Sequence, residues 1–367
     1  MISRSTLQRF MLGLTVLIIL ITGITAASAA AVSFAGKRIT AIVPFSPGGG
    51  SDTLVRFLAP YFRKYLPGKP AIIVRNVPGA GSIKGANMIE KVKKNGQTFL
   101  CCSASTLMNY IMQDKRIRFN PEKWIPFFNA PTGTAVYART DLGLTGNNLE
   151  DLKILQKKQV VFGCNSPTSG ELPRLLSMYL LGLNVKPVFG LNRGPVRLAF
   201  ERGEFTINYD SMAAYLVEVK QYIDSGLVTP LYSFGVWDSK KKQLVRDPSV
   251  PDMVHFAEAY EGLYGKKPSG PSFKVLVSAM SAVVMNNKVL VLPADTPKDL
   301  AEAWHTAAEK IVNDPKFQKE KAKKIGRYEI NLREDAKENL MNGIVMDAES
   351  RAWLRNFLTT QYGVKLD

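Results

Sequence analysis

The chain has 367 residues, of which 46% are hydrophobic and 22% are charged. This length and composition exclude an intrinsically disordered chain and leave room for two lobes, each with its own core. The formal net charge of +17 favours anionic partners of three classes: nucleic acid, an anionic membrane surface or a small polyacid. The sequence has no zinc-finger, RRM-like or helix-turn-helix pattern, which disfavours nucleic acid.

Residues 1–29 have the layout of a signal peptide. Arg4 and Arg9 precede an apolar run from Phe10 to Ile24, and Ala27-Ser28-Ala29 supplies a small-residue cleavage site. The alternative is an uncleaved anchor, but about 15 apolar residues fall short of the roughly 20 that span a bilayer. We therefore predict that the signal peptide is cleaved and that the protein is periplasmic.

From Lys37 on, short apolar segments typical of strands alternate with amphipathic segments typical of helices. Each of the first three units begins with a predicted strand: RITAIVPF at 38–45, AIIVRNV at 71–77 and TFLCCSA at 98–104. Each strand is followed by a turn rich in glycine or hydroxyl residues and then by a helix. This repetition predicts an α/β fold with a mostly parallel sheet, in which ligands bind outside the carboxyl ends of the strands.

A change of rhythm around 127–140 predicts that the chain crosses into a second lobe. Residues 136–273 repeat the strand, turn and helix pattern, with an irregular, charged insert at about 236–273. The segment KVLVSAMSAVVM, at 274–285, is predicted to be a strand. We therefore expect a discontinuous first lobe at 37–135 and 274–367 and a second lobe at 136–273, each a mostly parallel sheet flanked by helices.

Two glycine turns resemble nucleotide-binding loops but lack the residues that such loops need. The turn IVPFSPGGGSDT, at 42–53, has no Walker lysine, and the carboxylate of Asp52 would face the triphosphate. The turn GAGSIKG, at 79–85, has spaced glycines, but the next strand ends in CCSAS, without an acidic residue for a ribose. Nucleotide hydrolysis and nicotinamide chemistry are both disfavoured.

Catalytic and metal-binding patterns are also weak. The two histidines, His255 and His305, fit surface or packing positions, and there is no G-x-S-x-G nucleophile elbow. No histidines or cysteines have metal-ligand spacing. Cys101, Cys102 and Cys164 make an odd count, for which buried free thiols are favoured over a disulfide. We therefore expect a binding protein with no cofactor and no metal.

The turns that follow the strands suit a carboxylate. Unpaired backbone N–H groups at a helix N-terminus, together with the helix dipole, receive an anion without a side-chain charge. Glycine allows the backbone to approach the anion closely. Several such turns facing one another across two lobes would bind a small polyacid.

In these motifs the chain resembles the substrate-binding proteins of tripartite tricarboxylate transporters, the Bug or TctC-like family. The opening motif of the family, V-P-F-x-P-G-G-x-x-D, is matched by Val43, Pro44, Phe45, Pro47, Gly48, Gly49 and Asp52. Its second motif, V-x-N-x-P-G-A-G-G-x-x-G, is matched by Val74, Asn76, Pro78, Gly79, Ala80, Gly81 and Gly85. The segments TPKDLAEAW and NDPKFQKEKAKKIG are similar to its C-terminal helices. In the second lobe, FGCNSPTS replaces the usual Y-G-S-x-G-x-G-S loop.

The resemblance implies a monomeric, two-lobed periplasmic binding protein of the type II, or Venus-flytrap, class. Such a protein captures a small organic acid, a di- or tricarboxylate or a related carboxylate, and delivers it to a permease made of a large and a small subunit. An exported enzyme that acts on a small carboxylate on the same scaffold is the alternative. By analogy, we expect ligand contacts in the first lobe from Phe45, Gly49, Gly50, Ala80, Gly81, Ser103 and Thr106. In the second lobe we expect them from Asn165, Ser166, Thr168, Ser169, Asn192 and Asp210. Asp52 either caps its helix or contacts the ligand.

Overall fold

The structure is a computed structural model that describes residues 32–48, 50–191, 193–238 and 243–365. The predicted signal peptide lies outside the described residues, and so do Gly49 and Asn192. None of the helices in the described part of the chain is both long and apolar enough to cross a bilayer.

The described strands, in chain order, are β1 (Arg38–Val43), β2 (Ala71–Asn76), β3 (Thr98–Ser103), β4 (Ile125–Ala130), β5 (Thr134–Arg139), β6 (Gln159–Gly163), β7 (Asn184–Val188), β8 (Ile207–Ser211), β9 (Val228–Ser233), β10 (Val236–Asp238), β11 (Gln243–Val245) and β12 (Lys288–Leu292).

The described α-helices are α2 (Gly50–Tyr65), α3 (Ile83–Asn87), α4 (Ala104–Ile111), α5 (Asn148–Gln156), α6 (Leu172–Leu180), α7 (Arg193–Glu201), α8 (Met212–Ala214), α9 (Lys220–Asp224), α10 (Phe256–Tyr264), α11 (Gly270–Met280), α12 (Lys298–Val312), α13 (Pro315–Lys324), α14 (Arg333–Asn342) and α15 (Ala348–Tyr362). Short 3-10 turns are η1 (Ala80–Ser82), η2 (Met88–Lys91), η3 (Pro121–Lys123) and η4 (Thr140–Leu142), and two π-helical turns are η5 (Tyr215–Val219) and η6 (Ser281–Met285).

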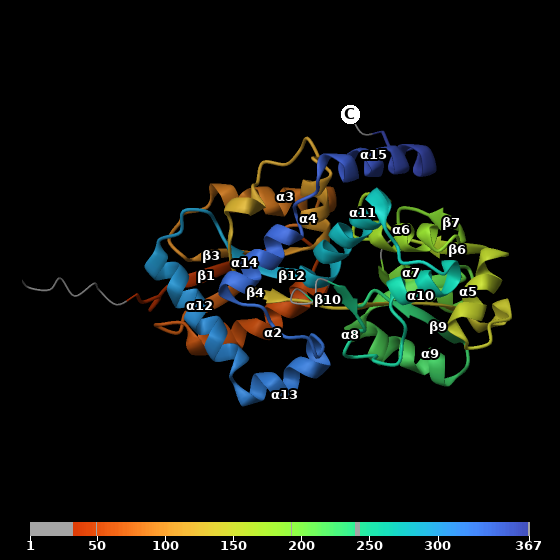
Figure 1. Ribbon diagram of the computed structural model, residues 1–367. Coiled ribbons are helices and arrows are strands. Elements are labelled where there is room, and N and C mark those ends of the chain that lie inside the picture. The colour runs from red at the N-terminus through yellow and green to blue at the C-terminus, as the bar shows by residue number, and fades with distance from the viewer. Residues whose placement is uncertain (1–31, 49, 192, 239–242, 366–367) are drawn as a thin grey trace, which may run out of the picture. The chain divides into compact units, whose positions relative to one another are not determined.

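The first lobe is built on a five-stranded sheet in the order β2-β1-β3-β12-β4. β1 pairs in parallel with β2 and β3, whereas β12 is antiparallel to β3 and β4. Helices α3 and α4 lie on one side of this sheet, and α2 and α12 lie on the other (Figure 1). Beneath α2 and α12, a cluster of fully buried rings, formed by Phe62, Phe99, Phe127 and Trp304, packs with centroid distances of 4.7–6.4 Å.

The second lobe has a three-stranded sheet, β8-β5-β9, and a parallel pair, β6-β7. Both pairings of β5 are antiparallel. The predicted α/β, two-lobed fold class is confirmed, but the sheets are less parallel than expected: the five-stranded sheet is mixed and the sheet β8-β5-β9 is antiparallel. β5 and β12 each enter their sheet directly from a crossing between the lobes, so they run against their neighbours, whereas the strand-helix-strand units give the parallel pairs.

The strand predicted over 274–285 is wrong, because this segment is helical in α11 and η6. An unbroken apolar run cannot be assigned by periodicity, since a buried helix and a buried strand both lack a polar face. Here Pro271 lies in the first turn of α11, where its missing N–H costs nothing. The returning strand is β12, which follows directly after η6.

Two crossings connect the sheets. Residues 131–133 lead from β4 to β5, and η6 leads from α11 to β12. The crossings contact each other, because the backbone N–H of Thr132 donates to the carbonyl of Val284 at 2.9 Å. Gly133 has no room for a side chain, since a Cβ there would lie 1.8 Å from a carboxylate oxygen of Asp247.

The domain boundaries remain a prediction, but the contacts of the last quarter can be described. β12, α12 and α14 contact β4 of the five-stranded sheet. α15 instead contacts α11, and Phe357 lies 4.9 Å from the ring centroid of Tyr179 in α6. The C-terminal helix therefore packs against residues that the sequence assigned to the second lobe.

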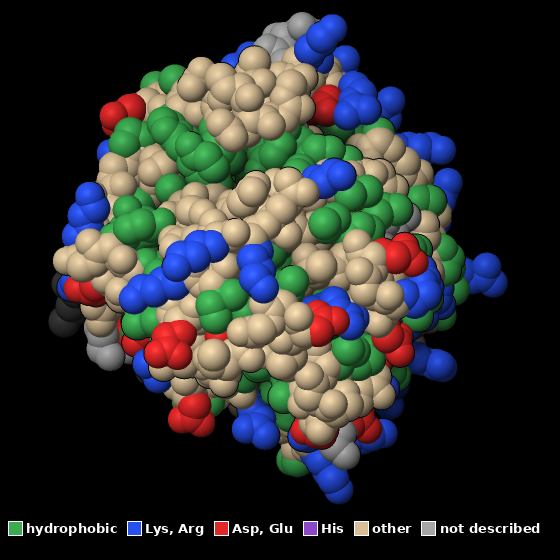
Figure 2. Space-filling view, turned by 90° about the vertical axis from the view of Figure 1, so that its right-hand side faces the viewer, with side chains coloured by type: hydrophobic (Ala, Val, Ile, Leu, Met, Phe, Trp, Pro, Cys, Tyr) green, Lys and Arg blue, Asp and Glu red, His purple; other side chains and the backbone are tan. Residues whose placement is uncertain are grey.

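The surface and the thiols follow the expectations from the sequence. Lys and Arg side chains are scattered around the face in Figure 2, with Asp and Glu between them, and do not form one continuous patch there. Cys101, Cys102 and Cys164 are all buried and free. Burial raises the pKa of the Cys101 thiol to about 12, so this thiol is not a reactive thiolate at neutral pH.

Candidate functional site

A cavity of about 620 Å³ lies where the turns after β1 and β3, the two crossings, and the ends of α6, α7 and β8 meet. We call it the polar cavity. Its lining includes Phe45, Gly48, Gly50, Ser51, Ser103, Ser105, Thr132, Glu171, Arg174, Arg197, Tyr209, Asp210, Lys288 and Lys324. This volume falls within the about 300–1,000 Å³ of small-molecule sites.

The first wall of the polar cavity is the turn between β1 and α2. α2 begins at Gly50, so its first backbone N–H groups have no partner within the helix. Asp52 is only 3% exposed and accepts hydrogen bonds from the backbone N–H of Gly48 at 2.9 Å, from Arg56 and from Asn76. The bond from Arg56 is the main reason that the pKa of Asp52 is lowered to about 2. These bonds hold the turn, and both predicted roles of Asp52, helix cap and ligand contact, remain predictions.

The second glycine turn is exposed at Ala80 and Gly81 and lies outside the lining of the polar cavity. The carbonyl of Gly81 accepts a 2.7 Å hydrogen bond from Asn109 of α4. Thr106 is fully buried, and its hydroxyl accepts from Ser82 at 3.0 Å. This turn therefore anchors α4, whose N-terminal residue Ser103 does line the polar cavity.

The second wall carries charged side chains from α6. Arg174 is 4% exposed and donates to the carbonyl of Gly170 and to the hydroxyl of Thr134, each at 2.5 Å. Its guanidinium lies 4.4 Å from the ring centroid of Tyr209. The buried carboxylate of Glu171 accepts from the Tyr209 hydroxyl at 3.0 Å and from Ser169.

An ion pair between α7 and β8 completes this wall. Arg197 lies 2.7 Å from a carboxylate oxygen of Asp210, whose side chain is only 4% exposed. The other oxygen accepts from the hydroxyl of Tyr137 at 2.7 Å. The pair keeps a guanidinium at the edge of the cavity and neutralises the carboxylate beside it.

One crossing contributes a hydroxyl, and the start of β12 contributes an ammonium. Thr132 is 7% exposed, and its buried hydroxyl has no hydrogen-bond partner among the described residues. Lys288 donates to the backbone and side-chain oxygens of Asn287 at 3.0 and 2.9 Å. Because an ammonium has three N–H groups, one remains for a ligand. Burial lowers the pKa of Lys288.

The predicted binding residues fall into three groups. Those that line the polar cavity are Phe45, Gly50, Ser103 and Asp210. Those that lie outside its lining are Ala80, Gly81, Thr106, Asn165, Ser166, Thr168 and Ser169. Gly49 and Asn192 lie outside the described residues.

Three of the residues outside the lining support it indirectly. Ser169 hydrogen-bonds to Glu171 and to the carbonyl of Ser166, and the Ser166 and Thr168 hydroxyls lie 3.2 Å apart. The turn therefore positions the start of α6. Ligand contact by these residues remains a prediction.

Sequence reasoning missed Thr132, Arg174, Arg197 and Lys288. One signal was available in the sequence. Arg174 interrupts the largely apolar segment LPRLLSMYL, and an arginine is rarely buried in such a segment unless it has a partner. Arg197 and Asp210 lie far from Lys288 in the sequence, and only the fold brings them to one cavity.

Metal and histidine chemistry find no support in the described residues. Within them, no group of three or more His, Cys, Asp or Glu side chains could hold a metal ion. His255 caps α10, since its ring nitrogen accepts from the backbone N–H of Ala257 at 3.1 Å. Neither His255 nor His305 lines the polar cavity.

Comparisons with known proteins place this geometry in context. No protein-family profile matches the chain. The curated protein BugT of Bordetella pertussis is 38% identical over 80 residues, which are 22% of this chain and 24% of BugT. The sequence match thus spans about a quarter of that relative's length.

Solved structures match nearly the whole chain. A TctC solute-binding protein from Polaromonas has a TM-score of 0.61 at 19% identity, over 88% of this chain and 98% of the other. MatC from Rhodopseudomonas palustris, with bound malate, has a TM-score of 0.58 at 17% identity, over 87% and 98%. An R. palustris protein with adipate has a TM-score of 0.61 at 18% identity, over 88% and 97%.

At these identities the solved structures establish the fold, and the BugT match adds a local likeness in sequence. The chain has the fold of the two-lobed periplasmic solute-binding proteins, and its resemblance to the Bug or TctC-like substrate-binding proteins of tripartite tricarboxylate transporters is confirmed.

Proposed function

We propose that this chain is an exported, monomeric solute-binding protein that captures a small di- or tricarboxylate in the polar cavity. It releases the ligand unchanged to a tripartite tricarboxylate-type permease. Export rests on the signal-peptide layout of residues 1–29, and the permease rests on the family resemblance. The ligand class rests on the cavity itself.

The charge of the lining supports an anionic ligand most directly. Four basic side chains, those of Arg174, Arg197, Lys288 and Lys324, line the polar cavity, against the two carboxylates of Glu171 and Asp210. Cations held in a partly desolvated cavity attract anions more strongly than the same charges do in water. A ligand with two or more carboxylates would offset this excess.

The uncharged groups suit the same ligand. The N-terminus of α2 offers backbone N–H groups, and Ser103, Ser105 and Thr132 offer hydroxyls. The unsatisfied hydroxyl of Thr132 is favourable only if a ligand or water bonds to it, because a buried polar group without a partner costs about 1–3 kcal/mol. Two neighbours in fold, solved with malate and adipate, bind dicarboxylates.

Binding is tested with the mature chain, residues 30–367. Thermal-shift and calorimetric titrations with malate, adipate and citrate should reveal at least one ligand that raises the melting temperature, whereas malamide should not. Mass spectrometry should recover that ligand unchanged. Turnover of the ligand would instead support the alternative of an exported enzyme.

A matched pair of variants tests the site. Arg197→Met removes a guanidinium that lines the polar cavity and breaks its ion pair with Asp210, so we expect at least tenfold weaker binding. Arg202→Met removes an exposed arginine whose partner is Glu204 and which lies outside the lining. Equal losses in both variants would show that overall charge, and not the proposed site, attracts the ligand.

A further inference from the structure

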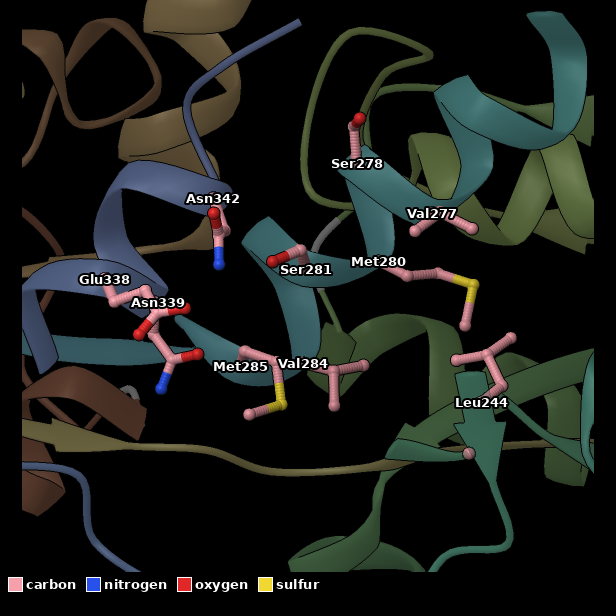
Figure 3. A pocket seen from close by; sticks show the side chains of 11 residues that line it. Leu244, Val277, Ser278, Met280, Ser281, Val284, Met285, Glu338, Asn339 and Asn342 are labelled. Carbon is pink, nitrogen blue, oxygen red and sulfur yellow. The ribbon is translucent and has the colours of Figure 1, made fainter. Parts of the chain in front are cut away.

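A second cavity, of about 350 Å³, lies beside the crossing η6. We call it the apolar cavity. One side is formed by Leu244, Val277, Met280, Val284 and Met285, and α14 supplies Glu338, Asn339 and Asn342 on the other (Figure 3). Its volume is at the lower end of the range for small-molecule sites.

The polarity of the apolar cavity is divided between its sides. In Figure 3 the three polar side chains of α14 lie together on one side, opposite the side chains of Leu244, Met280 and Val284. Glu338 is the only charged residue of the lining, and it forms no ion pair with the part of the chain that the structure describes. A ligand that fits this arrangement has an apolar body and a cationic, hydrogen-bond-donating head.

We propose that the apolar cavity is a second ligand site, which takes a small amphipathic amine whose ammonium faces Glu338 and whose apolar body contacts Leu244, Met280 and Val284. This site is distinct from the polar cavity, whose lining carries four basic side chains and several hydroxyls. The proposal stands whether or not the polar cavity binds a carboxylate.

The two cavities share one wall. Within η6, Val283 lines the polar cavity, whereas Ser281, Val284 and Met285 line the apolar cavity. π-Helical turns are rare and are frequent at functional sites. A molecule in either cavity therefore contacts the same five-residue turn.

Hydrogen bonds tie this turn and the residue after it to the other crossing and to α14. The carbonyl of Val284 accepts from Thr132 of the other crossing at 2.9 Å. Asn286, just after η6, donates from its side chain to the carbonyl of Asn339 in α14 at 2.6 Å. The turn is thus fixed to a residue that lines the polar cavity and to one that lines the apolar cavity.

This shared wall predicts coupling between the sites. Leu244 belongs to β11 and Glu338 to α14, so an occupant of the apolar cavity bridges elements that lie on either side of the crossing. Such an occupant opposes any motion that parts them, and we expect closure of the polar cavity about the crossings to require such a motion. The amine should therefore weaken carboxylate binding, and the carboxylate should weaken amine binding by the same factor.

The binding experiment uses 2-phenylethylamine as the probe and the mature chain. Calorimetry and ligand-observed NMR should show saturable binding with a Kd of about a millimolar, as expected for nine non-hydrogen atoms. Leu244→Trp fills the cavity from a half-buried position and should weaken binding at least tenfold. Circular dichroism and the melting temperature establish that this variant is folded.

Two glutamate-to-glutamine variants of α14 test whether the ammonium of the ligand faces Glu338. Glu338→Gln should weaken amine binding about threefold, whereas Glu334→Gln, on the same helix but outside the lining, should not change it. The neutral analogue 2-phenylethanol should bind equally to wild type and Glu338→Gln. Absence of saturable amine binding, or full binding by Leu244→Trp, would overturn the site, and an unchanged affinity in Glu338→Gln would overturn the assigned amine class.

The experiment that tests coupling between the two cavities rests on the proposed function, because it needs a bound carboxylate. The carboxylate that binds most tightly is titrated with and without saturating 2-phenylethylamine, and its Kd should rise about fivefold in the presence of the amine. An unchanged Kd would overturn the coupling. If no carboxylate binds, the amine titration alone still decides the site, so failure of the proposed function and failure of the second site are distinguishable.

Discussion

The two walls of the polar cavity are built in different ways. The first-lobe wall presents the start of α2 and the hydroxyl of Ser103, held in place by glycine turns that pack backbone against backbone. The second-lobe wall presents Arg174, Glu171 and the Arg197–Asp210 pair, which are side-chain charges. The first wall thus offers backbone and hydroxyl donors that are not specific to one carboxylate, whereas the charged side chains of the second wall are the groups that, in our proposal, select the ligand.

The largest effect is expected from Gly85, behind the first wall. A Cβ there would lie 2.7–2.8 Å from Pro44 and from the carbonyl of Val77. Gly85→Ala should therefore lower the free energy of unfolding by about 3 kcal/mol, since backbone atoms cannot yield as side chains do. Denaturant unfolding measures this loss. Gly50→Ala is the control, because its Cβ would meet only Lys288 at 3.7 Å, and an equal loss there would contradict the argument.

On the second wall, Arg174→Lys should weaken carboxylate binding at least tenfold and destabilise the fold by about 2 kcal/mol. An ammonium cannot reproduce both the fork to Gly170 and Thr134 and the stacking on Tyr209. Calorimetry and denaturant unfolding measure the two effects. A Lys variant with unchanged carboxylate affinity and unchanged stability would show that the planar geometry of the guanidinium is not needed.

Lys288 should make carboxylate binding weaker at alkaline pH. Burial lowers its pKa, and only the protonated ammonium attracts a carboxylate, so affinity should fall as pH rises at values below the ordinary lysine pKa of 10.5. The Cys101 thiol beside it, with its pKa raised to about 12, stays neutral over this range. Lys288→Met should bind about tenfold more weakly at pH 7 and show a flatter pH profile, in titrations from pH 7 to 10. An identical pH profile in the variant would assign the weakening to another group.

The stability that Asp52 contributes in the first wall should be lost at acidic pH. Its folded-state pKa is lowered to about 2 from 3.8, so its stabilising contribution is present above pH 4 and is lost as pH falls toward 2. Asp52→Asn should cost about 1 kcal/mol at pH 7, the size of a helix-cap substitution. Unfolding measured at several pH values should show the difference vanish near pH 2, and a constant difference would mean that charge is not the cause.

The smallest effect is expected at Thr132, where a substitution should weaken carboxylate binding without lowering the stability of the fold. Thr132→Val removes a buried hydroxyl that has no described partner, so stability should be unchanged or rise by up to about 1 kcal/mol. Carboxylate binding should weaken about threefold, because the hydroxyl is available to the ligand. Unchanged binding would show that Thr132 only lines the cavity without contacting the ligand.

How much the sequence predicts differs between the two walls. Local patterns sufficed for β1, β2, β3 and the glycine turns, because a strand, a tight turn and a helix start each need particular residues at short range. The prediction was wrong at 274–285, where an apolar run without a polar face is compatible with both helix and strand. Chain length and the change of rhythm at 127–140 predicted two lobes, and the turns that follow the strands predicted a carboxylate. The permease and the individual ligand contacts came from the motif resemblance.

The sequence by itself determined the α/β class, the anion-receiving turns and the position of Asp52 in its turn, since these depend on neighbours within a few residues. Only the tertiary structure decided that Ala80 and Gly81 lie outside the lining of the polar cavity, and that Thr132, Arg174, Arg197 and Lys288 belong to it. These side chains come from one crossing, two helices and a strand that are distant in sequence. Their charges act through space, and the distances between them are fixed by how the chain folds across the two lobes.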